Sequence, residues 1–285
     1  MIYIILLIQQ LIASGTHIVA KNLALSLDGA LIIFVRGLIA CSAYAIWILI
    51  KRKSLIKIEK KDIFQLIILG LLNIPLNQYI FFMAIKLTTP PNLALAYALT
   101  PVYVLIISHF YFKERLTKFK VLGILVAIAG SVLLLLEHGL DLSSNFLIGN
   151  SLGLLASFSW ALYTIMSRKF SLKYGPIYTT GLAMIWGFLL FVPIYLAVGA
   201  KGITTISGID WAYLFYVGFI TAVVGYAMWN YALSKLDASK VSVFNNLQPI
   251  LTTILAVIIF GQQITYIFVL GGILVIVGVI LTQKK

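Results

Sequence analysis

The stretch that decides the fold occurs twice in this chain. Residues 92–134 read NLALAYALTPVYVLIISHFYFKERLTKFKVLGILVAIAGSVLL, and residues 240–282 read KVSVFNNLQPILTTILAVIIFGQQITYIFVLGGILVIVGVILT. The copies align without a gap at a constant offset of 148, with 11 identities in 43 positions, including Pro101/Pro249, Thr117/Thr265, Gly123/Gly271 and Gly130/Gly278. Each copy has two apolar segments separated by a short polar break. A repeat of this length predicts a molecule built from two related halves.

The composition indicates that the solvent of this chain is a lipid bilayer. Of its 285 residues, 62% are hydrophobic and 10% are charged, whereas soluble domains carry about 25% charged residues. The apolar runs are ~20 residues long, which favours transmembrane helices over the ~10-residue strands of a barrel. We therefore expect an all-α membrane protein. Cys41 is the sole cysteine, so an internal disulfide or a thiolate metal site is excluded.

The apolar segments predict ten transmembrane helices, five in each half. The first half is expected at residues 1–138 and the second at 146–285. Because five is odd, the second half must enter the membrane upside down relative to the first, as in the inverted repeats of secondary transporters. The expected spans are 2–20, 29–50, 63–85, 92–112, 119–136, 146–167, 177–198, 211–234, 241–260 and 266–282.

The basic residues predict the orientation. If the N-terminus is cytoplasmic, the inside loops hold 17 lysines and arginines and the outside loops hold three, Lys21, Lys86 and Lys201; Arg36 lies within a span and completes the 21. This is the positive-inside distribution of a cell (cytoplasmic or inner) membrane protein with both termini cytoplasmic. The net charge of +13 is explained by it, so nucleic acid is not an expected partner.

The first copy of the repeat resembles a known family. Residues 98–135, with the proline of span 4, the break Lys113-Glu114-Arg115-Leu116-Thr117 and the glycines of span 5, are similar to the signature region of EamA-type transporters of the drug/metabolite transporter superfamily. Arg36, in FVRGLIA, matches the span-2 arginine of that family. The second copy departs from the signature with Gln262-Gln263. The resemblance implies ten helices in two inverted five-helix repeats, and export or exchange of small metabolites, often amino acids.

Arg36 is the most informative single residue. It lies about seven residues into span 2, or ~10 Å deep at 1.5 Å per residue, and no Asp or Glu lies inside any expected span. An embedded ionisable group indicates a functional site, and a substrate carboxylate is a suitable partner for a guanidinium. The alternative is that Arg36 extends towards the membrane surface or binds helix-end carbonyls.

Other embedded polar residues are candidates to line a substrate path. Asn73 and Asn77 share a helix face by their i, i+4 spacing, as do Tyr226 and Asn230, and helix packing is the alternative for both pairs. His17 is the best-placed embedded residue that titrates near neutrality. The candidate substrate-binding residues are Arg36, His17, Asn77, Tyr97, Thr100, Tyr163, Tyr226, Asn230, Asn245, Asn246 and Gln248.

Pro101 and Pro249 occupy equivalent positions in spans 4 and 9. Each is expected to kink its helix, freeing the carbonyls of Tyr97 and Asn245, and to serve as a gating element. Trp160, Trp186 and Trp229 fall within spans, so some of them line the cavity or pack between helices. The small residues of spans 5 and 10 predict close helix packing, with a homodimer contact as the alternative.

The sequence contains no metal-protease motif, phosphate-binding loop or embedded carboxylate pair, so we expect no enzyme, no cofactor and no metal. The favoured interpretation is a secondary transporter, an exporter or exchanger of small polar metabolites such as amino acids, working by alternating access. The alternatives are a drug or cation exporter of the same superfamily and a non-transporting integral membrane protein.

Overall fold

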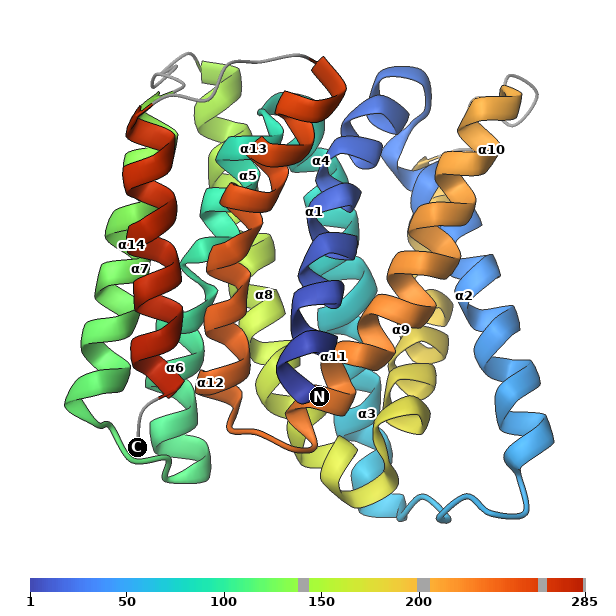
Figure 1. Cartoon of the computed structure of the whole chain (residues 1–285). Coiled ribbons are helices and arrows are strands. Elements are labelled where there is room, and N and C mark those ends of the chain that lie inside the picture. The colour runs from blue at the N-terminus through green and yellow to red at the C-terminus, as the bar shows by residue number, and fades with distance from the viewer. Residues whose placement is uncertain (138–143, 199–205, 261–265, 284–285) are drawn as a thin grey trace.

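The computed structural model describes residues 1–137, 144–198, 206–260 and 266–283, and every element of regular structure in these ranges is helical (Figure 1). The first half holds α1 (Ile2–Ser26), α2 (Gly29–Lys51), α3 (Lys60–Asn73), η1 (Ile74–Tyr79), α4 (Ile80–Leu87), α5 (Pro90–Ala98), α6 (Thr100–Phe112) and α7 (Lys118–Glu137). The second half holds α8 (Ser144–Tyr174), α9 (Pro176–Val198), α10 (Gly208–Phe215), η3 (Tyr216–Gly225), α11 (Tyr226–Leu233), α12 (Ala238–Ser242), η4 (Val243–Asn246), α13 (Leu247–Phe260) and α14 (Tyr266–Gln283).

In the described ranges these elements join end to end into ten helical spans, which confirms the predicted fold class. Six of the described segments are long and apolar enough to cross a membrane by length and composition alone. Two spans end six or seven residues later than predicted, and polar contacts explain both extensions. Helix α1 continues to Ser26 because Lys21 donates hydrogen bonds to the carbonyls of Ile85 and Thr88 at 2.9 Å, and α8 continues to Tyr174, whose hydroxyl binds Asp62.

Four spans are interrupted, in matching pairs. The third and eighth spans each contain a π-helical segment, η1 and η3, and π-helical turns frequently occur at functional sites. Pro75 lies in the first turn of η1 and has no N–H to donate to the α-helical ladder. The fourth span breaks at Leu99, between α5 and α6, and the ninth passes through the 3₁₀ turn η4 before α13 begins.

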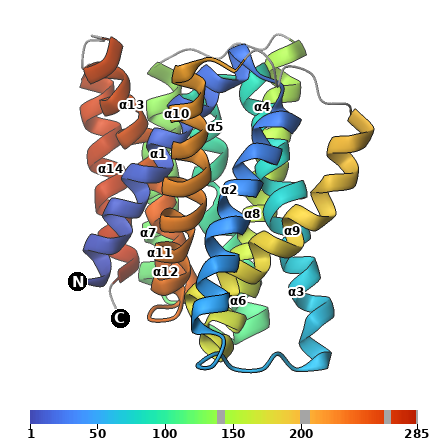
Figure 2. The same ribbon diagram turned by 90° about the vertical axis from the view of Figure 1, so that its right-hand side faces the viewer.

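The contact between α7 and α14 shows that the two halves are inverted copies. These helices lie side by side at one edge of the molecule (Figures 1 and 2). A Cβ added to Gly123 would lie 2.7 Å from the carbonyl oxygen of Gly278, and one added to Gly130 would lie 2.6 Å from that of Gly271. The residue numbers run in opposite directions, so the helices are antiparallel. In the repeat alignment Gly123 is equivalent to Gly271, and Gly130 is equivalent to Gly278. The two contacts are therefore equivalent to each other, as a two-fold axis perpendicular to the helices requires.

These glycine faces therefore pack against each other within the chain, as the close packing of small residues predicts. A homodimer contact stays a prediction. Elsewhere the halves interlock, because α2 packs on α9 and η3, α3 on α9, and α1 on α13 and η3. The buried core accordingly contains apolar residues from both halves, among them Leu31, Ile32, Phe82, Phe191 and Trp229.

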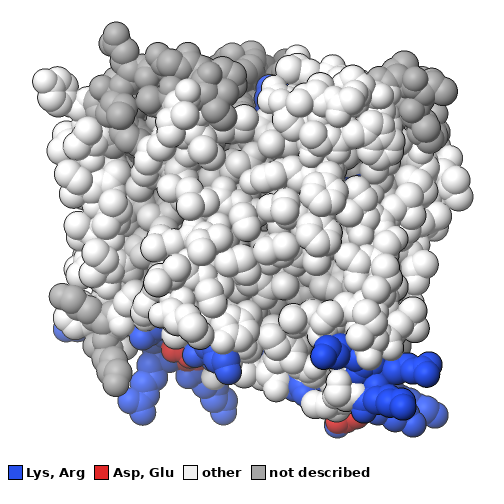
Figure 3. All heavy atoms as spheres, turned by 45° about the vertical axis from the view of Figure 1, so that its right-hand side comes forward, with Lys and Arg blue, Asp and Glu red and all other residues white. Residues whose placement is uncertain are grey.

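Lysine and arginine side chains gather at one end of the molecule, which we call the basic end (Figure 3). The described ion pairs belong to two clusters there. In the first, Glu114 and Asp237 face Lys120 and Arg168. In the second, Lys173 of α8 binds Glu59 and Asp62 at 2.6 Å, and Lys61 binds Glu59 at 2.8 Å. Each cluster joins a residue of the first half to one of the second.

Candidate functional site: a polar cavity between the two halves

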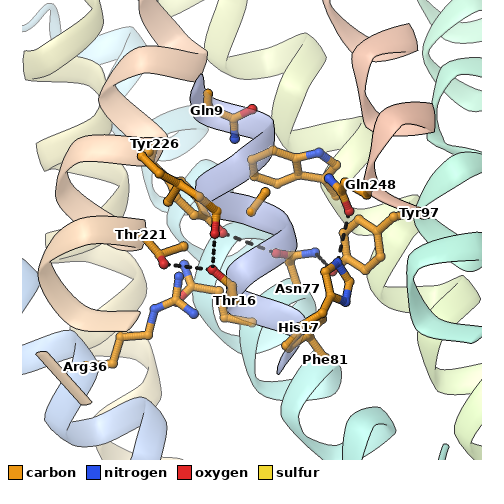
Figure 4. A pocket seen from close by; sticks show the side chains of 15 residues that line it. Gln9, Thr16, His17, Arg36, Asn77, Phe81, Tyr97, Thr221, Tyr226 and Gln248 are labelled. Atoms are coloured by element: carbon orange, nitrogen blue, oxygen red, sulfur yellow. Dashed lines mark hydrogen bonds between the residues drawn. The ribbon is translucent and has the colours of Figure 1, made fainter. Parts of the chain in front are cut away.

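A polar cavity lies between the halves, and both halves contribute residues to its wall (Figure 4). At the repeat offset of 148, Asn77 is equivalent to Gly225 and Gln78 to Tyr226, and all four residues line the cavity. The cavity therefore straddles the axis that relates the repeats, where inverted-repeat transporters hold their substrates. The lining residues are Gln9, Ile12, Ala13, Thr16, His17, Arg36, Asn77, Gln78, Phe81, Tyr97, Trp160, Thr221, Gly225, Tyr226 and Gln248.

Arg36 provides the fixed positive charge of this wall. Helix α2 begins where the side chain of Asp28 caps it by accepting a 2.8 Å hydrogen bond from the N–H of Ala30, and Arg36 follows two turns later. The side chain is 3% exposed, with its guanidinium 5.9 Å from the ring centroid of Tyr226. Its Nε atom is buried without a hydrogen-bond partner, and no described carboxylate pairs with it. An arginine kept this way is available to an anionic ligand.

His17 belongs to a chain of amides that joins α1 to α13. Its Nε2 lies 3.0 Å from the amide oxygen of Gln248, and because that oxygen can only accept, Nε2 carries the proton. The nitrogen of Gln248 donates to Gln10 at 3.1 Å, and Gln10 donates to Gln9 at 2.8 Å. The imidazole is held edge-on by Phe81, with ring centroids 5.2 Å apart. The His17 ring is therefore fixed beside the cavity with its Nδ1 unpartnered among the described residues.

A second network fixes the adjoining part of the wall, where Tyr97 meets the His17 ring edge-on at 6.0 Å. Asn77, in η1, donates to the hydroxyl of Tyr97 at 2.7 Å and to the carbonyl of Ala156 at 2.8 Å, and its oxygen accepts from Tyr226 at 3.5 Å. Trp160 of α8 stacks on Tyr163 at 5.2 Å and meets Tyr226 edge-on at 5.2 Å. Two helical segments of the first half, η1 and α5, and two of the second, α8 and α11, thus meet in this network.

The structure brings six of the eleven predicted substrate-binding residues to the cavity wall. They are Arg36, His17, Asn77, Tyr97, Tyr226 and Gln248. The other five do not line it. Asn230 lies behind the wall, where it donates to Tyr163 at 2.9 Å, and Asn245 is packed against Gln10, from which it accepts at 3.2 Å. Thr100 and Asn246 are buried, and their side-chain polar atoms have no partner among the described residues.

The shared face of Asn73 and Asn77 stays a prediction, but the two side chains have different neighbours. Asn73 faces α9, where its nitrogen lies 3.4 Å from the sulfur of Met184, and Asn77 faces the cavity. Of the three embedded tryptophans, Trp160 lines the cavity. Trp229 is fully buried and donates to Thr164 at 3.3 Å, and Trp186 packs partly buried against the core.

The cavity also contains residues absent from the predicted set. Gln9, Ala13, Thr16 and His17 follow the i, i+4, i+7, i+8 spacing of one helix face, a signal that could have identified Gln9 and Thr16 from the sequence. Thr16 meets Thr221 of η3 at 2.8 Å, so the two halves touch directly beside the cavity. Gln78 and Phe81 gave no such signal, because the π-helical turn changes the phase of their helix.

Pro101 and Pro249, the equivalent prolines of the two repeat copies, are buried. They lie in the first turn of α6 and of α13, directly after the breaks of the fourth and ninth spans. Both spans are therefore interrupted, and in each a new helix begins directly after the break. Tyr97 lies in the last turn of α5 and Gln248 in the first turn of α13, and both line the cavity. A gating role for the prolines stays a prediction.

The model of the EamA-like transporter family matches residues 1–136 and 147–283. The chain belongs to the EamA-like transporter family. An uncharacterized transporter of Bacillus subtilis (strain 168) is 30% identical over 226 residues, which cover 78% of this chain and 73% of the relative. An uncharacterized transporter of Archaeoglobus fulgidus is 29% identical over 284 residues, covering 99% of this chain and 97% of the relative.

A Salmonella typhimurium protein described as a "probable amino-acid metabolite efflux pump" is 29% identical over 218 residues, covering 73% of this chain and 72% of that protein. A solved crystal structure at 19% sequence identity superposes with a TM-score of 0.73 and covers 96% of this chain and 97% of that chain, which establishes the common fold. This EamA-like protein is therefore a multi-pass membrane transporter of a small molecule, not an enzyme.

Proposed function

We propose that this EamA-like protein is a secondary transporter that exports or exchanges small metabolites carrying a carboxylate, amino acids or related compounds. The observation that carries the proposal is Arg36, a 3% exposed residue on the wall of a cavity whose lining, among the described residues, contains no carboxylate. A charge inside the bilayer is costly unless it is paired. A bidentate carboxylate would pair it, and the printed function of the Salmonella relative agrees with this class of substrate.

The proposed orientation has the basic end in the cytoplasm and both termini on that side. Both described ionic clusters lie at this end, and so do the beginning of α1 and the end of α14 (Figure 1). Lysine and arginine are retained on the cytoplasmic side during insertion. Substrate would then reach the cavity alternately from the two sides, as the halves exchange conformations about their common axis.

The drug or cation exporter is the less favoured candidate, because a cation would meet Arg36 and find no carboxylate on the wall. The test is uptake into liposomes of purified wild type, Arg36→Lys and Arg36→Gln, with radiolabelled amino acids, their derivatives and organic cations. We expect flux of a carboxylate compound by wild type, reduced flux by Arg36→Lys, which keeps the charge and loses the bidentate geometry, and none by Arg36→Gln. Transport of cations alone, unchanged in Arg36→Gln, would refute the proposal.

The loss expected in Arg36→Gln binding is that of a charge-assisted hydrogen bond, ~1.5–3 kcal/mol, or roughly 10- to 150-fold in affinity. Substrate-dependent thermal stabilisation in detergent measures it without any transport step. Equal stabilisation of all three proteins by the same carboxylate would assign Arg36 to helix packing and remove it from the site.

A further inference from the structure

The free hydrogen-bonding groups on the cavity wall are mainly donors. The oxygen of Gln9 accepts from Gln10 at 2.8 Å, and its nitrogen binds no described residue. The indole N–H of Trp160 likewise has no hydrogen bond to the described part of the chain, although its ring is held by Tyr163 and Tyr226. Arg36 adds a guanidinium that carries donors only. A ligand rich in acceptors is the complement of this wall.

The acceptors on the wall are largely occupied. The oxygen of Asn77 accepts from Tyr226 at 3.5 Å, and that of Gln248 accepts from His17 at 3.0 Å. Within the described residues, Nδ1 of His17 is a buried acceptor of this wall left without a partner. An ammonium group has three donors and would find this imidazole nitrogen and the oxygen of Gln78, whose nitrogen donates to Asn73 at 2.8 Å. It would also place a second positive charge in the cavity beside Arg36.

Charge balance leads to the same conclusion. Arg36 and a ligand of charge −1 together form a neutral complex, whereas Arg36 and a zwitterion leave one net positive charge inside the bilayer, where an unpaired charge is costly. The rest of the wall suits a flat apolar group, because the rings of Phe81, Tyr97, Trp160 and Tyr226 line the cavity. Aromatic faces of this kind bind planar and apolar surfaces.

We infer that the cavity selects carboxylates that have no free ammonium group, namely N-acylated amino acids and 2-oxo acids with an apolar side chain, over the zwitterionic amino acids themselves. The inference rests on the transport function proposed above and names the substrate class of the same site. Gln9 and Trp160 become specificity-determining residues: their free N–H groups bind the acyl or oxo oxygen, while Arg36 binds the carboxylate.

The test compares four probes of one side chain on purified wild-type protein: phenylalanine, N-acetylphenylalanine, phenylpyruvate and phenylalanine amide. Affinity is measured by calorimetry, and flux is measured in liposomes. We expect N-acetylphenylalanine and phenylpyruvate to bind at least about tenfold tighter than phenylalanine, and the amide to show no binding. Phenylalanine binding as tightly as its N-acetyl derivative would overturn the inference while leaving carboxylate transport intact. Failure of all four probes to bind would overturn both proposals.

A charge placed in the cavity provides the sharper experiment. Gln9→Glu puts a carboxylate on the wall with little change in shape, and it should reverse the preference in favour of phenylalanine, because the ammonium group gains a partner. Gln65→Glu is the matched control. Gln65 lies at the basic end, where it accepts a 2.7 Å hydrogen bond from Lys169, so the same added charge should leave the preference unchanged. An unaltered preference in folded Gln9→Glu protein, or the same reversal in Gln65→Glu, would refute the role assigned to Gln9.

Discussion

The carboxylate of Glu114 accepts a 2.6 Å hydrogen bond from the hydroxyl of Ser239, so a loop of the first half caps a helix of the second. The other oxygen of Glu114 accepts from the N–H of Ala238 at 3.1 Å. Arg168 and Lys120 approach the same carboxylate at 3.5 and 3.6 Å. The side chain of Glu114 is 5% exposed, which makes this cluster the most deeply buried ionic link between the two halves in the described structure.

Replacement of Glu114 by glutamine should destabilise the protein. The amide keeps the shape of the side chain but leaves Arg168 and Lys120 facing one carboxylate, Asp237, in place of two. Removing one partner from a buried ion pair costs about 3 kcal/mol. Thermal unfolding in detergent measures the effect. Glu59→Gln is the control, because the Glu59 side chain is 45% exposed and exposed pairs contribute ~0–1 kcal/mol. Equal losses in both variants would show that the Glu114 cluster adds nothing specific.

Substitution of Gly123 by alanine should also destabilise, through the contact between α7 and α14. A Cβ at this position meets backbone atoms of Gly278 and Thr282, which cannot move aside as a side chain would. Overpacking of this kind costs ~1–3 kcal/mol. Gly208→Ala is the matched control, since nothing lies within 4 Å of a Cβ added there. The measurement is again the unfolding midpoint, and a Gly123→Ala midpoint equal to that of Gly208→Ala would contradict the close approach of the two helices.

Alanine in place of Pro101 or Pro249 should reduce transport more than it reduces membrane expression. Alanine supplies the missing N–H and favours a continuous α-helix across the break, which would move Tyr97 or Gln248 relative to the cavity. Flux in liposomes, divided by the amount of inserted protein, measures the effect. Normal flux in both variants would leave the prolines with a packing role.

Cysteine labelling should place the basic end inside the cell. In a Cys41→Ser background, a membrane-impermeant maleimide should leave Lys118→Cys unlabelled in intact cells and label it after permeabilisation. A cysteine at Ile206, which precedes α10 at the opposite end, should be labelled from outside. Labelling of Lys118→Cys in intact cells would reverse the orientation proposed from the lysine and arginine distribution.

The second cluster predicts a pH dependence. Hydrogen bonds from Lys173 and Lys61 hold the pKa of Glu59 below its ordinary value. A lowered folded-state pKa contributes stability that is present above the unfolded-state pKa and is lost as pH falls through the folded-state pKa. The unfolding temperature of the wild type should therefore fall between about pH 5 and pH 3, and that of Lys173→Met should fall less over the same interval. Parallel pH profiles for the two proteins would exclude this contribution.

The fold could be predicted from the sequence because its signals are long and redundant. The repeat at offset 148, the ~20-residue apolar runs and the basic loops each indicate ten spans in two opposed halves, and a bilayer permits few alternatives. Boundaries were less certain where polar side chains extend a helix beyond its apolar part. Helix α8 is an example, because Lys173 and Tyr174 belong to it through their bonds to Asp62.

The cavity was only partly predictable, because composition identifies polar residues but not the direction in which each one points. Arg36 was identified because a charge is rare inside a span, and Tyr226 because it shares a helix face with Asn230. Asn230 is also a polar residue inside a span, yet its side chain binds Tyr163 behind the cavity wall. Gln9 was missed although its helix face carried a periodic signal, and Gln78 was missed because the phase of a π-helical segment cannot be obtained from α-helical spacing.

That change of helical phase decides which side chains of each half face the cavity. A helix that closes its hydrogen bonds over five residues holds one surplus residue relative to an α-helix of the same run, and one residue corresponds to a rotation of ~100°. An uninterrupted α-helix through Ile74–Tyr79 would turn Phe81 away from the cavity, and one through Tyr216–Gly225 would turn Tyr226 away. Each half thus contains a π-helical segment in the equivalent span, six residues long in the first half and ten in the second, and the two segments decide which aromatic and amide groups of both copies face the cavity.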